Sequence, residues 1–380
     1  MRKSLAVIAA ACSSLLILSG CSTESETATE TAAPAASGSA AASGGQTTTT
    51  CAPGDRIGVA LPAQTSENWT LAKQLFEDQI TAAGFTPDVQ FADSGSSAVA
   101  SQQANADNML TQQAKVLVIG AENGQQLGSQ AEAAEAAGVP LIAYDRPIDA
   151  KATDYYVAFD NFKVGQLQGT ALLEGMEKNQ GASPWNIELF AGAATDANAP
   201  VFFNGAMDIL QPKIDDGTLV VTSGQTSFDQ VSTEGWKKEN AQKRMENLIT
   251  SDYNDGTPLH GVLSPNDQLA EGILNATSAA KLTPTVTGQD SEVVAVTRVA
   301  KGEQYSTIYK DTRKLVAESV AMIEKICTGE VFPTTATFTW PDSGLEIPTY
   351  YLEPLIVTAE NGEEVYADNA ELLEAFKAGQ

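Results

Sequence analysis

The sequence has a single histidine, His260, and its four cysteines form no CxxC pair. These absences argue against a zinc or redox site, and we expect neither a metal nor a cofactor. Basic residues are also few, since 22 Lys and Arg stand against 48 Asp and Glu, a formal net charge of −26. Such a charge repels nucleic acid, because phosphate binding needs clustered Lys and Arg. After residue 21 no apolar run reaches the roughly 20 residues that cross a bilayer, so the sequence predicts a soluble, acidic body.

The chain begins with the ordered parts of a secretory signal. Arg2 and Lys3 precede a hydrophobic run from Leu5 to Leu18, and small residues then lead to Cys21. A transmembrane helix is the alternative interpretation, but the run is shorter than the roughly 20 residues that such a helix needs. The residues before Cys21 resemble the lipobox of bacterial lipoproteins. We therefore expect residues 1–20 to be a lipoprotein signal peptide and Cys21 to carry lipid.

The segment that follows has the composition of a flexible linker. From Ser22 to about Pro53 it consists of Ser, Thr, Ala, Gly and a few Glu, with no apolar periodicity. Such segments stay disordered, because they cannot bury a core. The sequence predicts a tether over residues 21–54 that holds an extracytoplasmic body at the bacterial cell membrane through the lipid alone.

Two cysteines remain for the mature body. Cys12 leaves with the signal peptide and Cys21 is lipidated, so Cys51 and Cys327 are exported to an oxidising compartment. A disulfide between them would join the start of the body to a distant segment. Two unconnected thiols are the alternative, and the sequence leaves both open.

The body alternates short apolar runs with helical stretches. One helical face carries Trp69, Ala72, Phe76 and Ile80, whose spacing places them together. Buried strands that alternate with helices indicate parallel sheets covered on both faces. Ten strands exceed one ordinary sheet, so we predict two doubly wound α/β lobes. The predicted strands are 56–61, 89–92, 116–120, 140–144, 155–159, 187–191, 219–222, 261–263, 286–288 and 306–309.

Polar residues recur where these strands end, which is the edge at which open parallel sheets bind ligands. A single Asp or Asn in this position most often caps the next helix. Six occurrences favour a ligand site instead. They are Glu67-Asn68-Trp69, Glu122-Asn123, Asp145-Arg146, Asp196 with Asn198, Asn266-Asp267 and Gln289-Asp290.

The chemistry of this set suits a sugar. Hydroxyl groups donate and accept hydrogen bonds at once, so carboxylates, amides and cationic groups all find partners on them. The apolar face of a sugar ring can also be covered by an indole. Trp69 and Trp236 both stand beside polar residues at the start of a predicted helix. Each of them has an alternative role as a core residue at a helix start.

Several of these segments together resemble the periplasmic sugar-binding proteins of ABC importers, close to the xylose-binding and multiple-monosaccharide-binding proteins. The resemblance covers nearly all of residues 55 to 360. It implies a type I periplasmic-binding fold, in which three hinge crossings join the lobes. The segments are Ala143–Arg146, Phe159–Gly165, Asp196–Asn198, Leu263–Asp267, Gly288–Asp290 and Gly302–Thr307.

From this resemblance we expect an N-terminal lobe of residues 55–160 plus about 306–335, and a C-terminal lobe of 161–305 plus about 336–365. The sequence departs from the family where Asn68 replaces a common arginine and Ala197 a frequent asparagine; an amide lacks the forked charged donation of arginine. The sugar contacts of the family would fall on Glu67, Asn68, Trp69, Asp145, Arg146, Asp196, Asn198, Trp236, Asn266, Asp290 and Lys310.

The sequence thus predicts a monomeric, lipid-anchored substrate-binding protein that delivers a monosaccharide, xylose, glucose or a related aldose, to the permease of an ABC importer. There are three alternatives. A sugar-responsive repressor would carry a DNA-binding head where the signal and tether stand. A secreted carbohydrate-active enzyme would need paired acid and base groups, and no nucleophile, histidine cluster or phosphate loop stands out. A sensory receptor that presents the sugar to a chemoreceptor or sensor kinase is not separated from transport by sequence.

Overall fold

The computed structural model describes residues 46–380. The predicted signal peptide, Cys21 and most of the predicted tether lie outside these residues. Within them, no helix combines the length and apolar character that crossing a membrane requires.

The N-terminal lobe is built on a seven-stranded sheet with the order β11-β12-β5-β4-β3-β1-β2. Its strands are parallel except β11, which runs antiparallel to β12 at the edge. The strands are β1 (Arg56–Leu61), β2 (Thr86–Phe91), β3 (Val116–Ile119), β4 (Leu141–Tyr144), β5 (Tyr155–Phe159), β11 (Ala336–Thr339) and β12 (Glu346–Leu352). The helices are α1 (Glu67–Ala82), α2 (Ala98–Thr111), α3 (Gly128–Ala136) and α10 (Thr312–Cys327), with the short turns η1 (Gly95–Ser97) and η2 (Gly124–Gln126).

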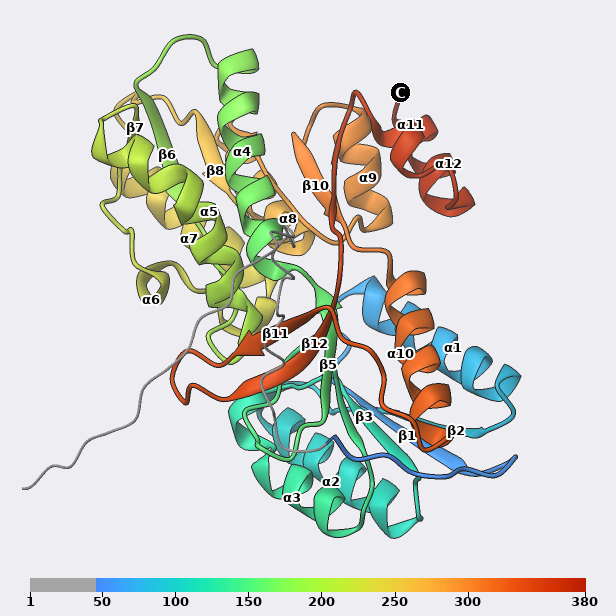
Figure 1. The fold of residues 1–380 in the computed structure, drawn as a ribbon. Coiled ribbons are helices and arrows are strands. Elements are labelled where there is room, and N and C mark those ends of the chain that lie inside the picture. The colour runs from blue at the N-terminus through green and yellow to red at the C-terminus, as the bar shows by residue number, and fades with distance from the viewer. Residues whose placement is uncertain (1–45) are drawn as a thin grey trace, which may run out of the picture. The chain divides into compact units, whose positions relative to one another are not determined.

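The C-terminal lobe has a four-stranded parallel sheet with the order β7-β6-β8-β9 and a separate antiparallel pair, β10 with β13. The strands are β6 (Trp185–Leu189), β7 (Leu219–Val221), β8 (Gly261–Leu263), β9 (Thr285–Val286), β10 (Ser306–Tyr309) and β13 (Leu355–Thr358). The helices are α4 (Asn161–Asn179), α5 (Asn198–Asp215), α6 (Phe228–Val231), η3 (Glu234–Trp236), α7 (Lys238–Asp252), α8 (Asp267–Ala279), α9 (Val293–Ala300), α11 (Gly362–Val365) and α12 (Ala370–Gly379). The prediction of two parallel-sheet lobes is confirmed (Figure 1).

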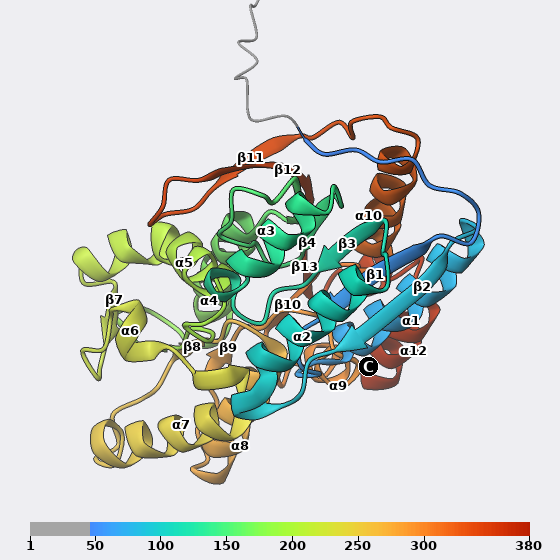
Figure 2. The same cartoon turned by 90° about the horizontal axis from the view of Figure 1, so that it is seen from below.

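Apolar side chains on both faces of each strand fix this layered arrangement. In β1, Ile57, Val59 and Leu61 belong to the core that α1 and α10 cover, while Ala60 belongs to the core under α2 and α3. Figure 2 shows these two pairs of helices on opposite sides of the sheet. The apolar stripe of α1 is buried as its spacing predicted. Burial on both faces is typical of parallel sheets. It leaves the ends of the strands, where the loops begin, as the part of the sheet that can contact a ligand.

The second and third crossings between the lobes lie later in the chain than expected. The first crossing is at Asp160, between β5 and α4, as predicted. The segment 306–309 was assigned to the N-terminal lobe, but it forms β10 and pairs with β13 in the C-terminal lobe. The segment 336–352 was assigned to the C-terminal lobe, but β12 pairs with β5 and extends the N-terminal sheet. The crossings therefore fall at Lys310–Asp311 and at Glu353–Pro354.

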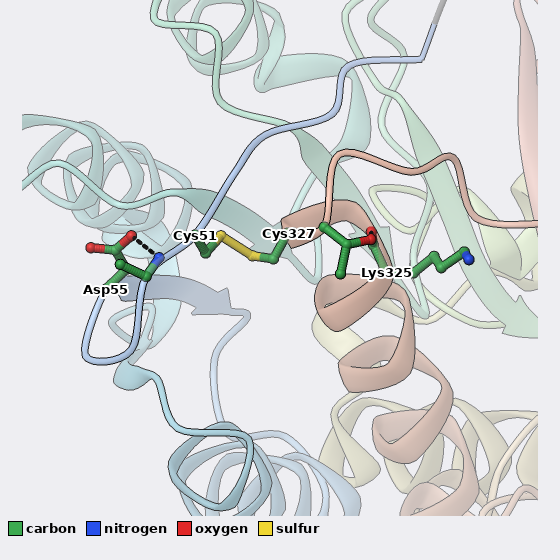
Figure 3. Close-up of a disulfide and its surroundings, with 6 residues drawn as sticks. Cys51, Asp55, Lys325 and Cys327 are labelled. Atoms are coloured by element: carbon green, nitrogen blue, oxygen red, sulfur yellow. Dashed lines mark hydrogen bonds between the residues drawn. A yellow bond between two sulfur atoms is a disulfide. The ribbon is translucent and has the colours of Figure 1, made fainter.

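The start of the described chain is fastened to the N-terminal lobe. Cys51 and Cys327 form a disulfide across 276 residues of sequence, with their Cα atoms 4.9 Å apart (Figure 3). Beside it the N–H groups of Thr49 and Cys51 donate to the carbonyls of Ile326 and Cys327, at 3.2 and 3.1 Å. The predicted tether reaches residue 54, but Thr49 and Cys51 are held by these bonds, because α10 ends with carbonyl groups that lack helical partners.

Candidate functional site

The loops at the carboxyl ends of the strands from both lobes enclose a small cavity. It measures about 60 Å³ as space open to the centre of a water-sized sphere, which is room for several waters. Every residue of the predicted site lines it except Glu67. The lining residues that the prediction omitted are Thr65, Ser66, Tyr144, Phe159, Phe202, Gln289, Thr312 and Leu315.

Asp196 is the central carboxylate of the cavity. Its Oδ2 pairs with Nε of Arg146 at 3.0 Å and accepts from Nε1 of Trp236 at 3.2 Å, while its Oδ1 accepts from the N–H of Asn198 at 2.9 Å. Burial raises the pKa of Asp196 above its ordinary value, although the Arg146 guanidinium and the Asn198 N–H favour the carboxylate. Because Arg146 belongs to the N-terminal lobe, this ion pair also joins the two lobes.

Asn198 makes a second bridge between the lobes. Its Nδ2 donates to the carbonyl of Asp145 at 2.7 Å, and its Oδ1 accepts from the hydroxyl of Tyr156 at 3.1 Å. The same hydroxyl also lies 2.8 Å from the carbonyl of Asp145. These contacts use the main-chain carbonyl of Asp145, which itself lines the cavity.

A cation and a carboxylate meet at the second crossing. Nζ of Lys310 lies 3.3 Å from Oδ1 of Asp290 and 5.5 Å from the ring centre of Phe202. Burial lowers the pKa of Lys310, but the carboxylates of Asp290, Asp145 and Asp196 raise it by more, so the ammonium stays charged. The pair supplies a donor and an acceptor side by side, which matches adjacent hydroxyl groups.

Asn68 stands where the resemblance leads one to expect an arginine. Its Nδ2 donates to the carbonyl of Asp290 at 3.2 Å, a further bond between the lobes. An amide thus satisfies the main chain of the opposite lobe and adds no charge to the cavity, where Arg146 and Lys310 are the cations among the lining residues.

Both predicted tryptophans line the cavity, and each carries a second function. Trp69 lies under the guanidinium of Arg146, whose Cζ is 5.2 Å from the ring centre, a cation–π arrangement. Trp236 donates to Asp196 and packs into the core of the C-terminal lobe. Each of these two side chains is 8% exposed and therefore combines a core position with a place in the cavity wall.

Asn266 likewise combines capping with a place in the cavity. Its Oδ1 accepts from the N–H of Leu269 at 3.0 Å and caps α8. The capping bond fixes the orientation of the side chain, so that its position in the cavity wall is set before any ligand arrives.

Three lining residues hold left-handed main-chain conformations: Asp145 (φ 59°), Trp236 (φ 55°) and Asp290 (φ 97°). Such conformations cost on the order of 1–3 kcal/mol each in non-glycine residues and persist where the surroundings enforce them. Three such residues lie around one cavity. This indicates that the placement of their side chains compensates for the unfavourable main-chain conformation.

Glu67 does not line the cavity, contrary to the prediction. It lies in a neighbouring groove at the cleft, where its Oε2 accepts from the N–H of Val293 at the start of α9, at 3.1 Å. Glu67 is the first residue of α1, and the helix start directs it across to the other lobe rather than inward. It therefore acts as a further link between the lobes.

Behind the cavity lies a buried acid, Asp267. Its carboxylate accepts from Nε2 of Gln304, the hydroxyl of Thr307 and the N–H of Glu292, at 2.7, 2.9 and 3.1 Å. Burial, with a smaller effect of Asp290, raises its pKa to about 7. Burial also raises the pKa of Glu292 to about 8, with smaller effects of Asp267, Asp290 and Glu67.

These raised pKa values predict a pH-dependent stability. The folded protein keeps protons on Glu292 and Asp267 at pH values where the unfolded chain, with ordinary values of 4.5 and 3.8, has lost them. The unfolding free energy should therefore fall as pH rises from about 4.5 to 8. Glu292→Gln should raise it by at least about 1 kcal/mol at pH 8 relative to wild type and change it little at pH 5. Urea unfolding at both pH values measures this.

The control for this experiment is Glu324→Gln, at an exposed position on α10. It should keep the pH dependence of the wild type. An equal gain from both variants at pH 8 would trace the effect to net charge instead of to the position of Glu292.

Gly192 is required by the indole of Trp236. A Cβ atom at Gly192 would overlap Cη2 and Cζ2 of that ring. Gly192→Ala should displace the indole, break its bond to Asp196 and weaken ligand binding about tenfold, with a loss of stability of about 1–3 kcal/mol. Titration calorimetry and thermal unfolding measure the two effects. Gly128→Ala is the matched control, because a Cβ there meets nothing within 4 Å; equal losses from both would contradict the steric explanation.

The fold and this cavity define a solute-binding protein with two lobes, and the comparison with known proteins gives the family. The model of the periplasmic binding protein domain matches residues 57–330, and the chain belongs to this family. It is a family of binding proteins, so the prediction that the chain is not an enzyme is confirmed.

Relatives at 30% identity or more include sugar receptors. The chain is 41% identical over 320 residues to the multiple sugar-binding periplasmic receptor ChvE of Rhizobium radiobacter, covering 82% of this chain and 89% of that protein. It is 31% identical over 309 residues to the D-xylose-binding periplasmic protein of Escherichia coli, covering 80% and 87%. A solved ABC transporter solute-binding protein from Clostridium phytofermentans, with bound β-D-glucose, is 37% identical with a TM-score of 0.78, covering 84% and 100%. The predicted resemblance is thereby confirmed.

Proposed function

We propose that this protein binds one monosaccharide, an aldohexose or aldopentose such as glucose or xylose, in the cavity between its lobes, and delivers it to the permease of an ABC importer. The observation that carries the proposal is the set of residues that line the cavity. Asp145 and Asp290, the cations Arg146 and Lys310, residues with amide side chains and two tryptophans all line one small cavity. Hydroxyl groups suit such a mixture, because they donate and accept at once.

The size of the cavity and the relatives support the same ligand class. A space of about 60 Å³ suits one sugar ring and leaves little for a second. Relatives named for multiple sugars and for xylose, and a solved structure with bound glucose, share the fold over most of its length.

Several bonds between the lobes favour a mechanism of hinge closure. They include Arg146 with Asp196, Asn198 with Asp145, Asn68 with Asp290 and Glu67 with Val293. Separation of the lobes would break these bonds. A ligand that hydrogen-bonds the polar groups of the cavity would offset the free-energy cost of burying them and so favour the closed form. Three crossings close together supply the hinge.

We further propose that the protein works outside the cytoplasm, anchored by lipid on Cys21. The basic start, short apolar run and small residues before Cys21 support an exported lipoprotein. The disulfide suits an oxidising compartment. Mass spectrometry of the protein from cells grown with and without globomycin tests the anchor. An uncleaved chain with a lipid-free Cys21 in untreated cells would refute it.

Titration calorimetry of the purified protein tests the ligand class. The panel contains D-xylose, D-glucose, D-galactose, L-arabinose and D-ribose. We expect one or two of them to bind with a micromolar dissociation constant or tighter, about −8 kcal/mol, which a ligand of roughly a dozen heavy atoms can supply. Maltose is the control, since a disaccharide exceeds the cavity. Absence of heat with every monosaccharide would overturn the proposal.

A further inference from the structure

Gln289 differs from the other polar residues of the cavity because its side chain has an unsatisfied end. It is 2% exposed and lines the cavity. Its Oε1 is buried and has no hydrogen-bond partner among the described residues. By contrast, both side-chain oxygens of Asp196 and the Oδ1 of Asn266 are bonded within the protein.

An unpaired buried amide requires an explanation, because buried polar groups in folded proteins are almost always hydrogen-bonded. The Nε2 of Gln289 has no hydrogen-bond partner among the described residues either, so turning the amide by 180°, which exchanges its oxygen and nitrogen, leaves the amide unpaired in both orientations. The terminal torsion of glutamine is broad, so the amide can rotate toward whatever enters the cavity. A hydroxyl group satisfies both orientations, since it donates to the oxygen and accepts from the nitrogen.

The main chain around Gln289 is held firmly, which distinguishes this amide from a loosely placed surface group. The carbonyl of Gln289 accepts from the N–H of Asp267 at 3.0 Å, and the N–H of Asp290 donates to the carbonyl of Ile308 at 2.9 Å. On the other side, Nε2 of Gln168 donates to the carbonyl of Gly288 at 3.2 Å. The protein therefore fixes three consecutive residues and leaves only the side chain of the middle one without its bond.

We infer that Gln289 is a ligand-contacting residue whose amide bonds one particular hydroxyl of the bound sugar, and that it sets the discrimination between sugars that differ at that hydroxyl. The inference rests on the proposed monosaccharide function and deepens it. A site built to hydrogen-bond one hydroxyl rejects the analogue that lacks it, because the buried group is then left unpaired.

Deoxy sugars identify the hydroxyl. Gln289→Met keeps the length and removes both polar atoms, so D-glucose should bind this variant about 10- to 100-fold more weakly than wild type. The 1-, 2-, 3-, 4- and 6-deoxy analogues of D-glucose, together with D-xylose, which lacks the hydroxymethyl group, are titrated against both proteins. The sugar that lacks the contacted hydroxyl should bind the variant and wild type with the same dissociation constant, within about twofold.

Thr285→Val is the matched control. Thr285 also carries a buried hydroxyl without a partner in the C-terminal lobe, but it does not line the cavity. Its replacement should leave all dissociation constants unchanged. Thermal unfolding of both variants checks that each is folded.

The outcomes separate the inference from the function on which it rests. Binding of D-glucose by wild type with an unchanged constant for Gln289→Met would overturn the inference and leave the proposed function standing. An equal weakening for every sugar would also overturn it, since Gln289 would then only position its neighbours. A wild-type protein that binds no sugar of either panel would overturn both.

Discussion

Replacing Asp196 with alanine is expected to weaken sugar binding by about 3 kcal/mol or more, at least about 100-fold. The carboxylate is 5% exposed and satisfies three donors, one of them the guanidinium of Arg146. Its removal leaves a buried cation without its ion pair and cuts one of the bonds between the lobes. Titration with D-glucose, or with whichever sugar of the panel binds wild type most tightly, measures the loss.

The control is Asp229→Ala, which removes an exposed carboxylate from the same lobe. Its dissociation constant should equal that of wild type. An Asp196→Ala protein that is folded and binds within about twofold of wild type would show that the cavity is not the sugar site.

Removing the disulfide is expected to cost about 3–5 kcal/mol of unfolding free energy. The bond closes a loop of 276 residues, and in the chain-entropy model a cross-link constrains the unfolded chain more as the loop grows. The variant is Cys51→Ser with Cys327→Ser, and urea unfolding without reductant measures the difference. Sugar affinity should be unchanged, because neither cysteine lines the cavity.

Wild type in the presence of reductant provides the matching comparison and should unfold like the double variant. Coincident unfolding curves for the oxidised wild type and the double variant would mean that the bond adds nothing beyond the main-chain pairing of Thr49 and Cys51 with α10.

The sequence predicted the parallel strands well because their signal is local. The runs at 56–61, 155–159 and 261–263 are apolar on both faces, and the strands found there have these bounds. The segment 336–358 was harder, since β11, β12 and β13 alternate exposed and buried residues and include Pro348. Which lobe such strands join depends on the strands with which they pair, and those strands lie far away in the sequence.

The predicted site illustrates the same division. The family resemblance placed ten of the eleven expected contacts on the cavity wall. Glu67 lies outside the cavity, because its direction depends on how the first turn of α1 faces α9. The rule that ligands bind at the carboxyl ends of strands was less selective, since Glu122, Asn123 and Asp267 also follow strands but do not line the cavity. The sequence places Gln289 beside Asp290 at the end of a strand but does not mark it as a contact, because an unsatisfied amide is recognisable only when its surroundings are known.

The fastening of the chain's start has a mechanical consequence. Thr47, Thr49 and Cys51 bond to Asp154, Ile326 and Cys327, all in the N-terminal lobe. A force applied through the preceding chain is therefore transmitted to the N-terminal lobe and does not pass through any of the three hinge segments. In the hinge closure proposed above, the N-terminal lobe would be the stationary arm, and the C-terminal lobe would move without working against the load. Tension from the point of attachment should leave the balance between open and closed forms, and with it the affinity for the ligand, unchanged.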